Sequence, residues 1–195
     1  MPTPTRERAD LQRERRSAET ARLASICWGD LVVQRRDDWL TPPYILDALG
    51  PFDLGPCASL AMPWATATRQ YTVEEDGLQQ QWSGRVWLNP PYSNAAAWVK
   101  RLSRHGIGTA LVFARTETSW WFESVWGHGT LALFLRGRVT FRAPDGSPSR
   151  NGHSTSPSVL VAYGERDAVA LEAATERRLL VGHLVDLRRS PATPR

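Results

Sequence analysis

Four consecutive residues, Asn89-Pro90-Pro91-Tyr92, carry groups that could hold and orient a planar amine. The lone pair of an aromatic amine is delocalised into its ring, so chemistry at that nitrogen needs acceptors that localise the pair and direct it. The Asn89 side-chain oxygen and the Pro90 carbonyl can both accept hydrogen bonds from such an amine. Pro90 and Pro91 would stiffen the turn, because proline has a fixed φ and no backbone donor. Tyr92 could then stack on a base extruded from a duplex.

A strand that ends in a Pro-Pro turn would show the same four residues without any catalytic role. The sequence on either side favours the catalytic interpretation. The run Arg85-Val86-Trp87-Leu88 predicts a strand directly before Asn89, and Ser93 or Asn94 can cap a helix after Tyr92. Such a strand and such a helix would position a turn between them.

The elements expected elsewhere alternate between strands and helices. Thr41 as N-cap and Pro42 at the first helical position predict a helix that ends at Gly50-Pro51. Further strands are expected at 52–54, 70–73, 108–113, 131–135, 139–141 and 158–163, with helices at 119–126 and 168–180 and a flexible loop at 144–157. This order predicts an α/β fold and fits a Rossmann-like sheet with antiparallel edge strands.

Composition indicates one globular core with appendages. The 195 residues are 42% hydrophobic and 23% charged, which is enough for one domain. We expect a charged N-terminal arm over residues 1–24, a catalytic domain over 25–165, and a C-terminal helix and disordered tail over 166–195. No run of residues is apolar enough for a membrane span or a signal peptide, so we expect a cytoplasmic protein of a bacterium or a phage-infected cell.

Neither the cysteines nor the histidines have the spacing of metal ligands. Cys27 and Cys57 form no CxxC pair, and the four histidines are scattered, so we expect no metal and no disulfide. Among the nine tryptophans, Trp87 and Trp98 fit core faces, whereas Trp39 and Trp120 fit an open cleft.

The formal net charge is +4, and nearly all of the positive charge is arginine. Arginine suits phosphate contacts, although a GC-rich genome would give the same bias. The residues that we expect to contact DNA phosphates are Lys100, Arg101 and Arg104 after the tetrapeptide and Arg138 near the late strands. A solvated helix face is the alternative for the first three.

Several motifs resemble, in order, those of the phage-type DNA N6-adenine methyltransferases. The resemblance covers about residues 39–163. It is carried by Trp39-Leu40-Thr41-Pro42, Phe52-Asp53-Leu54-Gly55-Pro56-Cys57-Ala58, Asp76-Gly77-Leu78 with Trp82, Gly84-Arg85-Val86-Trp87-Leu88-Asn89-Pro90-Pro91-Tyr92, Trp121-Phe122 and Gly137-Arg138-Val139-Thr140-Phe141.

The resemblance implies S-adenosylmethionine as cofactor and DNA as partner. It implies that Thr41 and Pro42 lie beside the methionine end of the cofactor and that Asn89 to Tyr92 are catalytic. The turn that would bind the cofactor contains Asp53, Pro56, Cys57 and Ala58, and Arg115 would face DNA or the active site.

One position departs from the family, which usually has Asp-Pro-Cys-Ala where this chain has Gly55-Pro56-Cys57-Ala58. Asp53 lies two residues earlier, so its side chain would share a strand face with position 55 and could supply the charge. Asp76 could bind ribose hydroxyls, although Glu74-Glu75-Asp76-Gly77 is equally typical of an acidic turn.

These expectations describe an enzyme that methylates the N6 amine of adenine at specific sites in DNA. Two alternatives stay open. The same tetrapeptide serves methyltransferases of protein glutamine and of RNA, and Gly55 is compatible with a catalytically impaired relative that only binds DNA.

Overall fold

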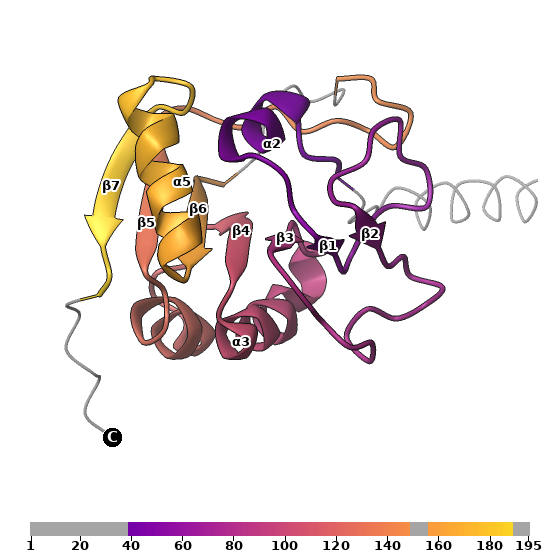
Figure 1. Cartoon of the computed structure of the whole chain (residues 1–195), viewed down its shortest axis with the longest axis horizontal. Helices are drawn as coiled ribbons and strands as arrows, with labels where there is room; N and C mark the ends of the chain where they lie inside the picture. Colours follow the sequence, from indigo (N-terminus) through magenta and orange to yellow (C-terminus); the bar gives the residue numbers. More distant parts are fainter. Residues whose placement is uncertain (1–38, 149–155, 189–195) are drawn as a thin grey trace, which may run out of the picture. The chain divides into compact units, whose positions relative to one another are not determined.

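A computed structural model of the chain describes residues 39–148 and 156–188. The predicted arm over residues 1–24, Cys27 and the last residues of the predicted tail lie outside this part. Within it, seven strands form one sheet in the order β2-β1-β3-β4-β6-β5-β7 (Figure 1). Helices pack on the sheet, so the fold is mixed α/β, and it is consistent with a methyltransferase-like fold.

The first half of the sheet is parallel. It consists of β1 (Leu54–Gly55), β2 (Arg69–Gln70), β3 (Val86–Leu88) and β4 (Gly108–Phe113). β1 pairs with β2 and with β3, and β3 pairs with β4. In open α/β sheets, ligands bind beyond the carboxyl ends of such strands. The residues that follow β1 and β3 therefore mark the edge where a site is expected.

The second half of the sheet is antiparallel. It contains β5 (Leu131–Leu135), β6 (Ser158–Tyr163) and β7 (Gly182–Asp186). β6 lies between β4 and β5 and runs antiparallel to both, and β7 pairs antiparallel with β5. Every residue of β6 is buried, as expected for an apolar strand inside a covered sheet.

Alternate strand residues point into two separate cores. Val86 and Leu88 of β3 pack with α3 (Ala95–His105), α4 (Ser119–Trp121) and the π-helical turn η2 (Phe122–Trp126). Trp87 packs instead with α2 (Pro43–Leu49) and α5 (Glu165–Glu176). The sheet is thus covered on both faces. The short 3-10 helix η1 (Tyr92–Asn94) leads from the tetrapeptide into α3.

The long apolar runs were predicted accurately, whereas the entry to α2 was not. The predicted strands 108–113, 131–135 and 158–163 coincide with β4, β5 and β6. The prediction of Thr41 as N-cap is wrong, because Pro42 occupies that position and no side chain caps the helix. Thr41 is held before the helix, where its side chain is 1% exposed. The end of α2 at Gly50 is as predicted.

Two other boundaries differ from the expectation. Residues 139–141 form no strand: Val139 and Phe141 are buried, but the backbone pairing here is between Arg142 and Leu40, with N···O distances of 2.9 and 3.0 Å. The edge strand β7 was not predicted, because it lies in a stretch expected to be disordered. Helix α5 begins at Glu165, earlier than the predicted start at 168.

A buried ion pair joins distant parts of the fold. The Arg85 guanidinium, 3% exposed, donates to Asp167 Oδ1 at 2.9 Å and to the carbonyls of Leu49 and Pro51 at 2.9 and 3.1 Å. Thr109 of β4 donates to the same carboxylate oxygen at 2.7 Å. This network connects the end of α2, the start of β3 and α5. No helix in the described part of the chain is both long and apolar enough to cross a membrane.

Candidate functional site

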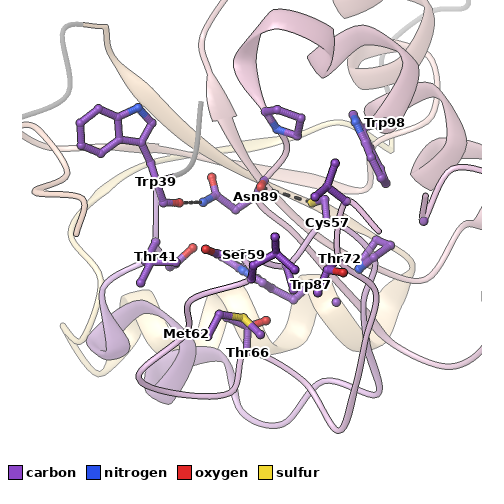
Figure 2. Close-up of a pocket in the computed structure, with 18 of the residues that line it drawn as sticks. Trp39, Thr41, Cys57, Ser59, Met62, Thr66, Thr72, Trp87, Asn89 and Trp98 are labelled. Carbon is purple, nitrogen blue, oxygen red and sulfur yellow. Dashed lines mark hydrogen bonds between the residues drawn. The ribbon is translucent and has the colours of Figure 1, made fainter. Parts of the chain in front are cut away.

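A cavity of about 550 Å³ opens at the carboxyl edge of the parallel strands. Its walls come from residues 39–41, the turn 55–60, the loop that contains Thr72 to Gly77, and the residues that follow β3 (Figure 2). Pockets of about 300–1,000 Å³ typically bind small molecules and cofactors. Motifs far apart in the sequence thus form one site of suitable size.

Asn89 lines this cavity, and one hydrogen bond fixes its side chain through the amide nitrogen and not through the oxygen. Its amide nitrogen donates to the Trp39 carbonyl at 2.6 Å, as the dashed line in Figure 2 shows. A carbonyl can only accept, so this bond decides which amide atom is turned toward Trp39. Asn89 Oδ1 is buried and has no hydrogen-bond partner within residues 39–148 and 156–188. The side chain therefore presents an unused acceptor.

The rest of the tetrapeptide is divided between the cavity and the core. Pro91 lines the cavity, whereas Pro90 is buried and does not. Tyr92 stacks face to face on Phe113, with ring centroids 3.7 Å apart and an interplanar angle of 10°. Phe141 meets Tyr92 edge-on at 6.2 Å. Phe113 therefore covers one face of the Tyr92 ring, and that face is not turned toward the cavity.

The turn after β1 forms another wall. Pro56, Cys57 and Ala58 all line the cavity. The Cys57 thiol donates to the Asn89 carbonyl at 3.3 Å, which connects this turn to the tetrapeptide. Burial raises the pKa of the Cys57 thiol to about 12, so it stays neutral near pH 7. Cys57 serves as a small packing residue and is not an activated nucleophile.

The loop that contains Asp76 and Gly77 packs directly on this turn. A Cβ at Gly77 would lie 1.8 Å from the Pro56 carbonyl oxygen, so only glycine permits this approach. Asp76 has a positive φ of 49°, and the exposed residue lines the cavity. The structure therefore brings the Asp76 carboxylate to the same cavity as Asn89.

Thr41 lines the cavity beside Trp39, whereas Pro42 does not. The Thr41 carbonyl accepts a hydrogen bond from Trp64 Nε1 at 3.2 Å. Its hydroxyl oxygen is buried without a partner. Like Asn89 Oδ1, this atom is a polar group at the cavity that lacks a protein partner.

Asp53 does not reach the cavity, which corrects the suggestion that it replaces the missing acid. Its carboxylate accepts a hydrogen bond from the Arg85 backbone nitrogen at 2.7 Å and serves the turn before β3. At Gly55, which lines the cavity, an added Cβ would lie 2.9 Å from the Thr66 hydroxyl oxygen. That hydroxyl donates to Gln70 at 2.9 Å. Thr66 and Gln70 therefore fill the space next to Gly55.

The basic residues predicted to contact DNA differ in the interactions that they make within the protein. The guanidinium of Arg101 donates to the carbonyls of Leu78 and Gln80 and lies over the Trp82 ring, so Arg101 holds the loop 78–82. Lys100 pairs with Glu123 across 3.7 Å, and both side chains are more than half exposed. The remaining three, Arg104, Arg115 and Arg138, are exposed.

Two predicted core tryptophans also belong to the site. Trp87 and Trp98 are 2% and 7% exposed, as expected for core residues, yet both line the cavity. The Trp87 indole nitrogen is another buried atom without a partner. The available signal was its position on the strand that leads directly into the tetrapeptide. Trp39 lines the cavity as well, whereas Trp120 lies against Trp121.

Among the described residues, no three His, Cys, Asp or Glu side chains are grouped as metal ligands would be.

A comparison with protein-family models matches residues 29–178 to the family described as DNA N-6-adenine-methyltransferase (Dam). The match covers more than half of the chain, which therefore belongs to this family. No curated protein and no solved structure matches the chain.

Proposed function

We propose that the chain transfers a methyl group from S-adenosylmethionine to the N6 amine of adenine at specific sites in DNA. The observation that carries this proposal is Asn89: a buried side-chain oxygen with no partner, held at a cavity by the bond between its amide nitrogen and Trp39. Membership of the adenine-methyltransferase family supports the same activity. On this proposal the sheet is the Rossmann-like sheet of such enzymes.

Two properties of the cavity support S-adenosylmethionine as its ligand. Its volume is suitable, and its walls carry three buried polar atoms without partners, on Thr41, Trp87 and Asn89. Such atoms are costly to bury unpaired, so they mark places where a ligand can be bound. We infer that Asp76 binds the ribose hydroxyls and that Pro56, Cys57 and Ala58 pack along the cofactor. When bound, the cofactor supplies a methyl group on a positively charged sulfur.

The chain's own role in the reaction is to orient the amine. Asn89 Oδ1 and the Pro90 carbonyl accept hydrogen bonds from the two N–H groups of the amine. These bonds localise the nitrogen lone pair and direct it at the methyl group. The stiff Pro90-Pro91 turn fixes both acceptors. After transfer the nitrogen carries an extra proton, which it loses readily because the neutral aromatic amine is far more stable. The reaction therefore needs no strong base in the cavity.

Tyr92 is proposed to stack on the extruded adenine. Because Phe113 covers one ring face, the adenine must stack on the opposite face or displace Phe113.

For contacts with the DNA backbone, Arg104, Arg115 and Arg138 are the better candidates, since Arg101 already holds a loop. Lys100 can exchange its exposed partner Glu123 for a phosphate at little cost. We place the enzyme in the cytoplasm, where its DNA substrate is found.

The test is methyl transfer by the purified chain and by Asn89→Ala. We expect labelled methyl from S-adenosylmethionine to enter DNA as N6-methyladenine, and Asn89→Ala to lower the rate at least about a hundredfold, as loss of an orienting acceptor does in other enzymes. Binding of S-adenosylhomocysteine should change little, because Asn89 contacts the amine. RNA and protein serve as alternative acceptors in the same assay. Label in either of those and not in DNA would refute the proposed substrate.

A second candidate, a DNA-binding relative without activity, is motivated by Gly55. This residue leaves the cavity without the acid that the family usually has there. The candidate predicts DNA binding that does not respond to the cofactor. Calorimetry with S-adenosylhomocysteine distinguishes the two, because a well-folded chain that fails to bind it would favour the inactive relative.

A further inference from the structure

Trp87 occupies an unusual position for a core tryptophan. It lies on β3, which ends at Leu88 and leads directly into Asn89. Its ring packs on Phe52, with centroids 5.2 Å apart, and the residue is 2% exposed. It also lines the cavity (Figure 2). Trp87 therefore belongs both to the core and to the lining of the site.

The indole nitrogen needs an acceptor. Trp87 Nε1 is buried and has no hydrogen-bond partner among the residues that the structure describes. An indole N–H can only donate, so its partner must be an oxygen or nitrogen that accepts. Burial without such a partner is unfavourable, and native proteins rarely tolerate it. An acceptor on a bound molecule would satisfy this atom.

Charge and placement point to a carboxylate. Among the described residues, no lysine, arginine or histidine lines the cavity, so an anionic group there would be held by neutral donors. The Thr41 hydroxyl, also buried without a partner, is a second such donor. Within the described part of the chain, Asp76 is the one acidic residue of the lining; it lies on a separate loop, where it would repel a carboxylate and attract hydroxyls.

We propose that the Trp87 indole N–H donates a hydrogen bond to the carboxylate of the methionine part of S-adenosylmethionine, with the Thr41 hydroxyl as a second donor. This rests on the proposed function. Trp87 and Asn89 line the same cavity, so a carboxylate bound at Trp87 would lie near the reacting methyl group, as the short methionine chain requires. Trp87 is then a positioning residue that fixes the sulfonium relative to Asn89.

The experiment compares two nucleosides that bind without reaction. S-adenosylhomocysteine carries the carboxylate, whereas 5′-methylthioadenosine has the same nucleoside and sulfur without the amino-acid part. Calorimetry of both is done with the full chain and with Trp87→Phe, which keeps an aromatic ring but removes the N–H. We expect Trp87→Phe to weaken S-adenosylhomocysteine by at least about tenfold, as loss of a hydrogen bond to a charged group does, and 5′-methylthioadenosine by less than about threefold.

Trp98→Phe is the matched control. Trp98 lines the same cavity from α3 and stacks on Trp82. Its replacement should affect both nucleosides equally, because the proposal places the carboxylate at Trp87 and not at Trp98. A melting curve of each variant shows whether it is folded.

Three results would overturn the proposal. If Trp87→Phe weakened both nucleosides by the same factor, its role would be packing alone. If it weakened neither, water or another acceptor would satisfy the indole. In both cases the proposed cofactor would stand. If the unmodified chain bound neither nucleoside, the proposed cofactor and the Trp87 contact would fall together.

Discussion

At the scale of single residues, Cys57 gives a pH-dependent prediction. Burial raises the pKa of its thiol to about 12, well above the ordinary cysteine value of about 8.5. The thiolate is the reactive form, so at pH 8.5 the folded protein should react with iodoacetamide roughly a thousandfold more slowly than the unfolded chain. The rate in the folded protein should still rise tenfold for each pH unit between about 9 and 11.

Alkylation of Cys57 is followed by mass spectrometry in a Cys27→Ser background, with and without denaturant. The chain has two cysteines, so replacing Cys27, which lies outside the described residues, leaves Cys57 as the one thiol to observe. If the rate in the folded protein levelled off near pH 9, the thiol would titrate normally and the turn after β1 would be more open than described. S-adenosylhomocysteine should slow the reaction further, because Cys57 lines the cavity.

The sequence identified single residues best where a motif defined them. Asn89, Pro56 and Asp76 were expected at one site, and all three line one cavity. Asp53 was misplaced because the i, i+2 rule assumes a continuous strand, whereas β1 begins only at Leu54. Trp87 was assigned to the core alone, since a hydrophobic pattern shows that a side chain is buried but not where its one polar atom points.

At the scale of elements, accuracy followed the length of the apolar run. β4, β5 and β6 have five or six residues each, and their bounds were predicted. β1 and β2 have two residues each, so their existence depends on pairing with neighbours and not on a local pattern. Residues 139–141 have the alternating pattern of a strand, but the backbone hydrogen bonds here join Leu40 to the next residue, Arg142. β7 was missed because its residues are only partly buried.

The contact between two loops at Gly77 yields a prediction at this scale. In Gly77→Ala the new Cβ would overlap the Pro56 carbonyl oxygen at 1.8 Å, so the loop and the turn must move apart. Overpacking of this kind costs about 1–3 kcal/mol of stability. Because both segments line the cavity, affinity for S-adenosylhomocysteine should also fall, by about tenfold or more, measured by calorimetry.

Gly137→Ala separates this effect from backbone strain. Gly137 has a positive φ of 83° and no atom within 4 Å of an added Cβ, so its replacement strains the chain without moving a neighbour. We expect a stability loss of about 1 kcal/mol and unchanged affinity. If Gly77→Ala also left the affinity unchanged, the loop that contains Asp76 would not be part of the cofactor site.

At the scale of the whole molecule, the α/β class followed from the order of elements, but the ties between distant segments did not. Arg85 and Asp167 are separated by 82 residues, and nothing in either local pattern indicates that they pair. Both are charged residues that a hydrophobicity pattern assigns to the surface, yet they are 3% and 0% exposed. Only the assembled sheet, with α5 packed over it, brings them together.

The same ion pair gives a prediction about global stability. Burial raises the pKa of Asp167, and the bonds from Thr109 and Arg85 act in the opposite direction, so desolvation outweighs the attraction within the pair. Replacing both partners by well-packed apolar residues could therefore be neutral, but removing one partner leaves a buried charge uncompensated. Asp167→Ala should lower the free energy of unfolding by about 3–5 kcal/mol, measured by urea denaturation.

Arg188→Ala is the matched control, because Arg188 is 35% exposed and pairs with Glu165, Glu172 and Asp186 at the surface. Its removal should cost less than about 1 kcal/mol, since water screens exposed pairs. If Asp167→Ala cost no more than this control, Arg85 would reach solvent or other acceptors in the variant. Its bonds to Leu49 and Pro51 would then suffice to hold the end of α2 to β3, and the tie to α5 would be dispensable for the fold that carries the cavity.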